Sequence, residues 1–159
     1  MTVSSVVYDD DNNDIQEYNE SGFFDVTFSN IGPVNATNVS CVLSCSTSGI
    51  TITHDTITIP SLAANASTTI NNAFSLSIAD NIANGTVANF TITMTISGYT
   101  PWTYEFFRII SAPALQFGNI TIYDPTGNNN GRLDPGETVT ISLLLNNIKK
   151  KVAMQLQPW

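Results

Sequence analysis

A stretch of twelve residues near the N-terminus has the composition and spacing of a calcium-binding loop. It reads DDDNNDIQEYNE from Asp9 to Glu20, and oxygen-bearing side chains stand at its positions 1, 3, 5, 9 and 12. A hard cation takes roughly six to eight oxygen ligands, and this spacing is that of a loop of EF-hand type. The expected calcium ligands are the side chains of Asp9, Asp11, Asn13, Glu17 and Glu20 and the main-chain carbonyl of Ile15.

A second copy of this loop lies further along the chain. A constant shift of 117 aligns residues 9–39 with residues 126–156 without a gap, and it pairs Glu20 with Glu137. Two like segments at a fixed spacing are typical of an array of like modules. The candidate ligands of the copy are Asn128, Asn130, Arg132 through its carbonyl, Asp134 and Glu137.

The two loops differ in ways that affect cation binding. The first has Asp14 where the motif expects glycine, whereas the second has Gly131 there. The second has Thr126 in place of the first aspartate, and Asp124 could replace it only if the loop is wound differently. Four candidate carboxylates against two predict tighter binding at the first loop. The alternative is that both are solvated turns, because Asn-Gly and Asp-Pro-Gly are common turn formers.

Strands must position these loops, because short runs rich in Thr, Val, Ile and Phe alternate with Gly, Asn, Asp and Pro. In the stretch Gly22–Asn30, for example, Phe24, Val26 and Phe28 share one face. About seven strands in the first ~110 residues predict an all-β, antiparallel β-sandwich. The predicted strands are Val3–Tyr8, Gly22–Asn30, Thr37–Ser44, Ile50–Ile59 with a break at His54-Asp55, Ser67–Ser77, Thr86–Ser97, Trp102–Ile110, Ala114–Tyr123, Thr138–Asn147 and Val152–Trp159.

The repeat and the strands together predict two domains. Residues 1–113 have the length of a complete module, since about 115 residues is a typical domain. Residues 114–159 match only the start of such a module and are interpreted as an N-terminal fragment of a second, homologous copy. The apolar strand faces of this fragment have no partner sheet in the same copy. We therefore expect it to pack on the first module or to form a homo-oligomer.

Charge and hydropathy exclude several partners. The net charge is -8, and the first basic residue is Arg108. Nucleic acid and anionic membranes both require cationic patches, so neither is expected to bind. No apolar run approaches the ~20 residues of a membrane helix, so no membrane insertion is expected. No signal-peptide pattern follows Met1, which we expect to open a piece of a longer protein.

The remaining reactive side chains favour structural roles. Cys41 and Cys45 would lie roughly 13 Å apart on an extended strand, beyond the ~7 Å limit of a disulfide, so two free thiols are expected. His54 with one of these thiols could act as a base and nucleophile, but no nucleophile elbow or oxyanion-hole loop accompanies them. Catalysis by this chain is therefore not expected. A cluster of aromatic residues could line a glycan-binding face or cover the core: Tyr99, Trp102, Tyr104 and Phe106.

The most specific pattern is the run GNNNGRLDPGETV (127–139) followed by LLLNN (143–147), with short matches at SNIG (29–32), ATNV (36–39) and YTPW (99–102). It resembles the immunoglobulin-like modules that follow the catalytic domain of gingipain-type cysteine peptidases, and related adhesion modules of secreted Bacteroidetes proteins. The resemblance covers nearly the whole chain, although Lys149-Lys150-Lys151 stand where the first module has Gly32-Pro33-Val34. It implies an immunoglobulin-like fold, a secreted or surface-anchored bacterial protein, and no catalytic residues in this chain.

The expected function is therefore a non-catalytic accessory or spacer module of a secreted or cell-surface bacterial protein. Its expected partners are the adjacent domains of that protein, and its expected cofactor is calcium, held as a structural clip. The alternative is an adhesion module that binds a glycan or a protein.

Overall fold

A computed structural model describes residues 1–9 and 15–148 of the chain. All regular elements among these residues are β-strands. The chain divides into two compact units, Met1–Ala112 (unit 1) and Pro113–Trp159 (unit 2). The strands are β1 (Thr2–Asp9), β2 (Ser21–Ser29), β3 (Ala36–Cys45), β4 (Ile50–His54), β5 (Thr56–Leu62), β6 (Ser67–Ile78), β7 (Thr86–Thr95), β8 (Trp102–Ile110), β9 (Leu115–Tyr123) and β10 (Thr140–Asn147). The predicted strand Val152–Trp159 lies outside the described residues.

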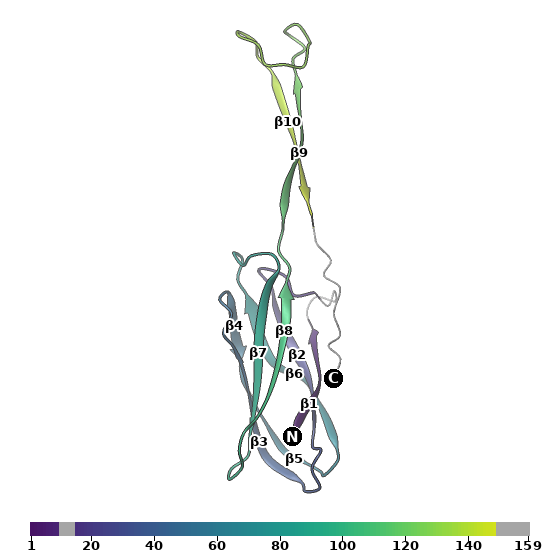
Figure 1. Cartoon of the computed structure of the whole chain (residues 1–159), viewed down its shortest axis with the longest axis vertical. Coiled ribbons are helices and arrows are strands. Elements are labelled where there is room, and N and C mark those ends of the chain that lie inside the picture. The colour runs from purple at the N-terminus through teal and green to yellow at the C-terminus, as the bar shows by residue number, and fades with distance from the viewer. Residues whose placement is uncertain (10–14, 149–159) are drawn as a thin grey trace. The chain divides into compact units, whose positions relative to one another are not determined.

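Unit 1 is an antiparallel β-sandwich, as predicted. One sheet has the order β1-β2-β6-β4 and the other β5-β3-β7-β8 (Figure 1). Each sheet of this sandwich therefore has four strands. The predicted break at His54-Asp55 divides the Ile50–Ile59 run into β4 and β5, which belong to different sheets. This division gives eight strands where about seven were expected.

Strict alternation along β2 explains how this sheet faces the core. Phe24, Val26 and Phe28 are completely buried, whereas the intervening Phe23 is 43% exposed. The opposite sheet supplies apolar side chains from alternate positions of β3 and β7, namely Val39, Cys41, Leu43, Phe90, Ile92 and Met94. Burial of such side chains is the main favourable term in folding.

An aromatic cluster joins the two sheets at the centre of this core. Phe24 of β2 meets Phe90 of β7 edge to face, with ring centroids 5.2 Å apart and an interplanar angle of 78°. Phe106 of β8 lies 5.3 Å from Phe24 and stacks on Phe90 at 5.1 Å. Cys41 and Cys45 both lie on β3 and are free thiols, as expected.

A half-buried arginine closes one side of the sandwich, where β8 runs next to β1. The Nη2 of Arg108 donates a hydrogen bond of 2.7 Å to the carbonyl oxygen of Val6. Its guanidinium lies over the rings of Phe106 and Phe24, 5.2 and 5.9 Å from their centroids. Desolvation by burial lowers the pKa of Arg108, and the charge of Tyr104 opposes this. The first basic residue of the chain therefore links the edge strands of the two sheets.

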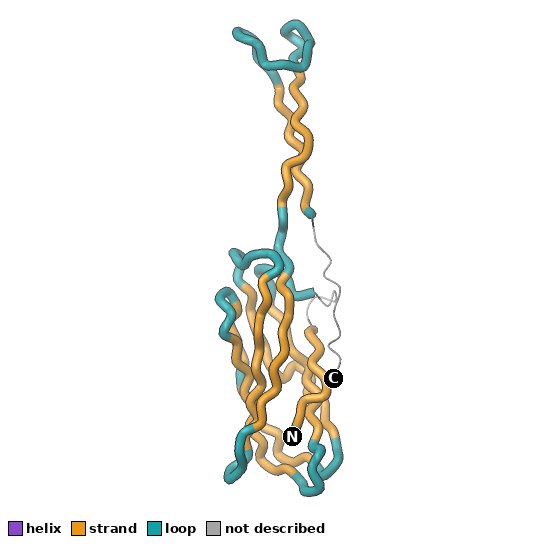
Figure 2. The backbone as a smooth tube through the Cα atoms, viewed as in Figure 1, coloured by secondary structure: helices purple, strands orange, loops and turns teal. Residues whose placement is uncertain are grey.

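The described part of unit 2 is a two-stranded antiparallel hairpin of β9 and β10 (Figure 2). Its pairing repeats that of β1 and β2. Tyr8 pairs with Phe24, and Ile122 pairs with Ile141. Ile141 follows Phe24 by 117 residues, but Ile122 follows Tyr8 by 114. The two hairpins therefore correspond with a shift of 117 in the second strand and 114 in the first.

The position of the β-bulge supports this correspondence. In unit 1 the register shifts between Val3 and Ser5, so that Ser4 is the extra residue. The residue 114 positions after Ser4 is Gly118, and it lies in the register shift of β9, between the partners of Leu143 and Leu145. Both hairpins thus bulge in the same strand at the same step, a feature that one residue of slippage would remove.

The gapless alignment of the two loops is therefore wrong by three residues. The chain takes 13 residues, 10–22, from Asp9 to its partner Phe23, and 16 residues, 124–139, from Tyr123 to its partner Thr140. The counterpart of Asp9 is Tyr123, not Thr126. Sequence alignment missed this because the matching Asn and acidic residues lie within the loops, whereas the difference in length appears only from the strand register on either side.

The described residues contain no helix long and apolar enough to cross a membrane.

The Phe24 cluster generates a direct test of the core. Replacement of Phe24 by Ala should lower the free energy of unfolding by about 3–5 kcal/mol, because it removes a fully buried ring and leaves a cavity. The matched control is Phe23→Ala on the outer face of the same strand, which should cost less than about 1 kcal/mol. Chemical denaturation followed by tryptophan fluorescence measures both. Equal losses for the two variants would contradict the assigned faces of β2.

Candidate cation-binding loops

Loop 1, residues 10–20, joins β1 to β2. Asp9 is the last residue of β1 and pairs with Phe23. The predicted ligands Asp11 and Asn13 lie outside the described residues. The other three predicted ligands, Ile15, Glu17 and Glu20, are each half-buried in the second half of the loop.

Backbone hydrogen bonds tie this second half of loop 1 to strand ends of unit 1. The amide of Ser111, just after β8, donates to the carbonyl of Gln16 at 2.8 Å, and the amide of Tyr18 donates to the carbonyl of Ser111 at 2.9 Å. At the end of β6, the amide of Ile78 donates to the carbonyl of Glu20 at 2.7 Å. Contacts with the sandwich therefore fix the backbone conformation of the second half of loop 1.

The carboxylate of Glu20 also shapes loop 1. Its Oε2 accepts a hydrogen bond of 2.6 Å from the amide of Glu17. Between them Asn19 has a φ of 56°, a left-handed conformation that asparagine tolerates better than most residues. The structure therefore places two of the predicted ligands, Glu17 and Glu20, in one tight turn.

Loop 2, residues 124–139, is organised around a buried carboxylate. Asp124 directly follows β9 and is 1% exposed. Its Oδ2 accepts a hydrogen bond of 3.0 Å from the amide of Asn130, and its Oδ1 accepts one of 3.3 Å from the amide of Gly131. Its carbonyl accepts from the amide of Gly127 at 3.1 Å and so closes a turn. A buried carboxylate needs such donors, because an unpaired charge in this position would be costly.

The predicted ligands Asn128, Asn130 and Asp134 come together on the outer side of loop 2. The side-chain amides of Asn128 and Asn130 donate to Oδ2 of Asp134, at 2.9 and 2.8 Å. These two hydrogen bonds lower the pKa of Asp134, with the larger effect from Asn128, and slight desolvation acts in the opposite direction. The Oδ1 atoms of both asparagines accept from amides two residues further on. All three residues therefore present oxygen atoms within one short loop.

The predicted ligand Glu137 turns back toward the start of loop 2. Its Oε1 accepts a hydrogen bond of 3.1 Å from the amide of Asn128. Its Oε2 is buried and has no hydrogen-bond partner within the described part of the chain. A Cβ at Gly127 would overlap this carboxylate, so the glycine is what lets Glu137 approach.

The donor chemistry of loop 2 fits a hard cation in part. Carboxylates at Asp124, Asp134 and Glu137, amide oxygens of two asparagines and the carbonyl of Arg132 are the oxygen types that calcium prefers. The buried, unbonded Oε2 of Glu137 is the atom that such an ion would satisfy. In residues 1–9 and 15–148, however, no three acidic, histidine or cysteine side chains converge tightly enough to hold a metal. Binding would therefore require Asn128 and Asn130 to turn their amide oxygens toward Asp134.

Asp124 was considered at the sequence level only as a replacement for the first aspartate, on the condition that loop 2 is wound differently. The constant shift of 117 placed Thr126 at the first position and Asp124 outside the motif. The strand register makes Tyr123 the counterpart of Asp9, and Asp124 directly follows it in the chain. The sequence did contain a signal for this position. The alternating strand pattern ends at Tyr123, and Asp124-Pro125 then begins a turn, which marks Asp124 as the first residue of loop 2.

The candidate nucleophile Cys41 and the candidate base His54 lie in different environments. Cys41 is buried in the core, and desolvation raises the pKa of its thiol to about 12. A thiol with that pKa holds almost no thiolate at neutral pH, and the thiolate is the nucleophilic form. His54 is exposed at the end of β4. This pair therefore offers no activated nucleophile.

The predicted aromatic face turns mostly inward. Trp102, Tyr104 and Phe106 are half-buried against the core, whereas Tyr99 is exposed and stacks on Trp102 with centroids 6.2 Å apart.

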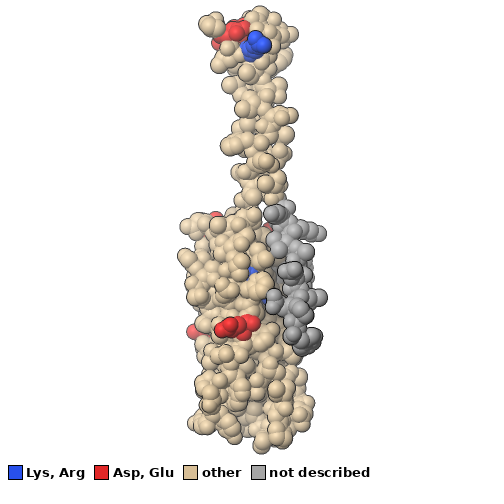
Figure 3. All heavy atoms as spheres, in the orientation of Figure 1, with Lys and Arg blue, Asp and Glu red and all other residues tan. Residues whose placement is uncertain are grey.

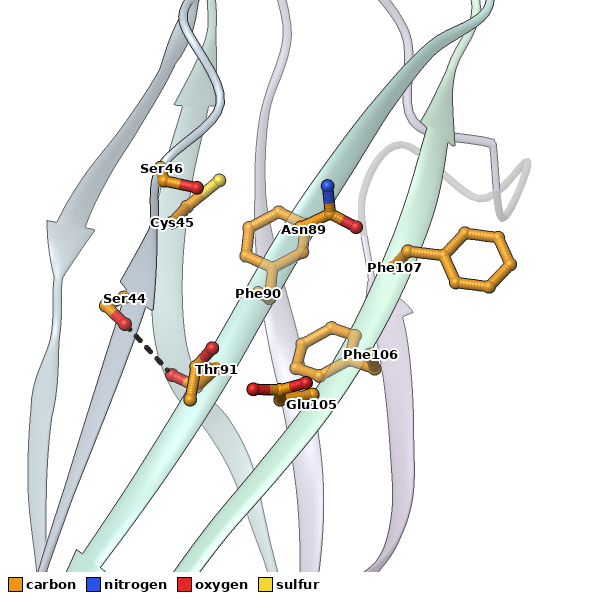
Figure 4. A pocket seen from close by; sticks show the side chains of 9 residues that line it. All are labelled: Ser44, Cys45, Ser46, Asn89, Phe90, Thr91, Glu105, Phe106 and Phe107. Carbon is orange, nitrogen blue, oxygen red and sulfur yellow. Dashed lines mark hydrogen bonds between the residues drawn. The ribbon is translucent and has the colours of Figure 1, made fainter. Parts of the chain in front are cut away.

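A shallow groove of about 540 Å³ lies over β3, β7 and β8 (Figure 4). The side chain of Phe107, at its margin, points away from the other lining residues. Ser44, Asn89, Thr91 and Glu105 supply the polar lining of the groove.

The role of Asp124 can be tested at the amides that it holds. Asp124→Asn should accelerate hydrogen exchange of the Asn130 and Gly131 amides by roughly tenfold or more, because bonds to a charged acceptor are worth about 1.5–3 kcal/mol. Asp134→Asn is the matched control, since Asp134 accepts from side chains and not from these amides. Amide-resolved exchange by NMR gives the result. Equal protection in both variants would contradict an organising role for Asp124.

No protein-family model matches this sequence, and no curated protein is found to be similar to it. The functional interpretation of the chain therefore depends on its own residues, above all on the two hairpins and the oxygen-rich loops that close them.

Proposed function

We propose that this chain is a non-catalytic accessory module of a secreted or cell-surface bacterial protein. In this role unit 1 acts as a spacer or stabiliser beside other domains of a longer protein. The observation that carries the proposal is the repeated hairpin, with one pairing register and one bulge in both units. Repetition of a structural unit is typical of arrays that present or separate domains. The resemblance to immunoglobulin-like modules of gingipain-type peptidases agrees with this role.

The chemistry of unit 1 supports a structural role. One of its two cysteines, Cys41, is held in the core as a thiol. Its outer sheet faces carry hydroxyl groups that bond to one another across strands, such as Thr27 to Thr69 at 2.8 Å and Ser29 to Ser67 at 2.7 Å. Cross-strand pairs of this kind stabilise a sheet without demanding a ligand.

We also propose that calcium is the cofactor of this module, bound as a clip in the loops that open each unit. In loop 1 the ion would neutralise an acidic segment that carries six of the 13 acidic residues of the chain, between Asp9 and Glu20. In loop 2 it would be held by Asp124, Asp134 and Glu137 with the two asparagines. Its physical contribution is to offset repulsion among carboxylates and to fix the path between two strands.

A binding role is the second candidate, and one observation favours it. Tyr99 is 65% exposed and stacks on Trp102, which makes a small aromatic platform at the turn between β7 and β8. Aromatic platforms of this kind can contact the apolar face of a sugar ring or a protein side chain.

Sequencing the gene around this chain tests the accessory role. The proposal predicts a reading frame that continues into a catalytic domain, such as a Cys/His peptidase. A frame without any catalytic domain, combined with a glycan-array signal that Tyr99→Ala abolishes, would contradict it and favour the binding role. Phe107→Ala is the control for that array, because Phe107 is an exposed aromatic residue elsewhere on the same sheet.

Calcium binding is tested by thermal melting. Calcium should raise the melting temperature by several degrees, since a ligand at ~100 times its Kd stabilises the folded state by about 2.7 kcal/mol. Glu20→Gln should reduce the shift, whereas Glu105→Gln, on the outer face of β8, should leave it intact. Magnesium should have a smaller effect, because it dehydrates reluctantly. Identical melting curves in chelator and in millimolar calcium would sink the proposal.

A further inference from the structure

The hairpin of unit 2 has one apolar and one largely polar face. Residues that pair directly across two strands point to the same face, and neighbours along a strand point to opposite faces. One face therefore carries the paired residues Ile141 and Ile122, Leu143 and Ile120, and Leu145 and Phe117. The other face carries Thr140, Tyr123, Ser142, Thr121, Asn146 and Gln116, with Leu144 at the bulge. We call the first set the apolar hairpin face.

The counterparts of this face in unit 1 are core residues. By the shifts of 117 and 114, Leu143 corresponds to Val26 and Phe117 to Val3. Val26 is completely buried and Val3 is 5% exposed, whereas Leu143 is 45% exposed and Phe117 is 76% exposed. In unit 1 the covering layer is a second sheet, formed around β3 and β7. The same pattern of side chains is therefore covered in unit 1, whereas the described residues of unit 2 provide no covering layer.

Exposed apolar side chains are concentrated in unit 2. Within the described part of the chain, ten of the 19 exposed large hydrophobic residues lie among residues 113–148, which are a quarter of that part. The strands themselves carry no charge: the acidic and basic residues of this region, Asp124, Arg132, Asp134 and Glu137, all belong to loop 2. In Figure 3 these charges gather at the loop end of the hairpin, and its stem shows none. Natural sheets usually protect such surfaces with charges or prolines.

We propose that the apolar hairpin face is an interface for a second copy of this chain, which docks with the same face. Covering a sheet face requires another face with alternating branched and aromatic side chains, at a separation of about 10 Å. The apolar hairpin face has this pattern itself, and it bears no charge that would repel its copy. Two identical faces pair about a twofold axis, so the contact closes as a dimer. The inference depends on the equivalence of the hairpins and not on the calcium proposal.

The face is a stronger source of association than the free edge of β10. In unit 1 the outer edge of β2 pairs with β6 from Ser21 to Ser29, and the described residues provide no such partner for β10. Edge amides in water are already hydrogen-bonded, so strand addition mostly exchanges one bond for another. Covering the face instead removes apolar surface from water, which is favourable in itself.

Variants of two adjacent leucines, Leu143 and Leu144, distinguish association through the apolar hairpin face from association through any other surface. Sedimentation equilibrium of the full chain in chelator should show a dimer whose fraction rises with concentration. Leu143→Arg places a charge in the centre of the apolar hairpin face and should leave a monomer. Leu144→Arg is the matched control, because Leu144 is 54% exposed on the opposite face of the same strand, and this variant should still dimerise.

A milder variant guards against misfolding of the hairpin. Leu143→Thr keeps a high strand propensity but shortens the side chain, and it should raise the dissociation constant by roughly tenfold or more. Circular dichroism of each variant checks that the strands persist. A wild-type chain that stays monomeric, a dimer that survives Leu143→Arg, or equal loss of the dimer in the Leu143 and Leu144 variants would each overturn the proposal.

Discussion

A β-hairpin with one apolar face needs a second layer over that face, since two strands alone are barely stable in water. This requirement determines how unit 1 is built. The faces of β1 and β2 are covered by the sheet of β3 and β7, and the rings of Phe24, Phe90 and Phe106 fill the space between the layers. Arg108 then joins the edges of the two sheets through the carbonyl of Val6. The β9–β10 hairpin repeats the pattern and register of the first hairpin without a described covering layer.

The two loops solve the same connection in different ways. Loop 1 is held from outside, by backbone bonds to the ends of β6 and β8 at Ile78 and Ser111. Loop 2 is held from inside, by the carboxylate of Asp124 and by the contacts of Asp134 with two asparagines. Counted between paired strand residues, loop 2 is three residues longer than loop 1, and the amide of Gly127 donates to the carbonyl of Asp124 to close its first turn. The shape of loop 2 is therefore supported by contacts within the loop itself.

Strand faces could be predicted from the sequence because alternation is a direct consequence of strand geometry. The burial of Phe24, Val26 and Phe28 and the break between two strands at His54-Asp55 were both visible in this way, whereas the change of sheet at that break was not. Alternation does not say which of two patterned faces lies inside. Trp102, Tyr104 and Phe106 therefore remained open between core and binding surface until the structure placed them against the core.

The register of the second hairpin could not be predicted from the sequence, because a gapless alignment cannot detect an insertion inside a loop. That limit led to Thr126, in place of Tyr123, as the counterpart of Asp9. The link between Arg108 and Val6 was hidden for a similar reason, since 102 residues separate them and no local pattern reports such a contact. Contacts of this kind follow from the packing of sheets and not from neighbouring residues.

The central claim is that both hairpins are copies of one structural element, with an insertion of three residues in the second loop. Cross-strand nuclear Overhauser effects in the labelled protein test this most directly. The account predicts contacts of Ile141 with Ile122 and of Leu145 with Phe117, as Phe24 contacts Tyr8 and Phe28 contacts Val3. Contacts of Ile141 with Pro125, the partner required by a gapless repeat, would contradict it.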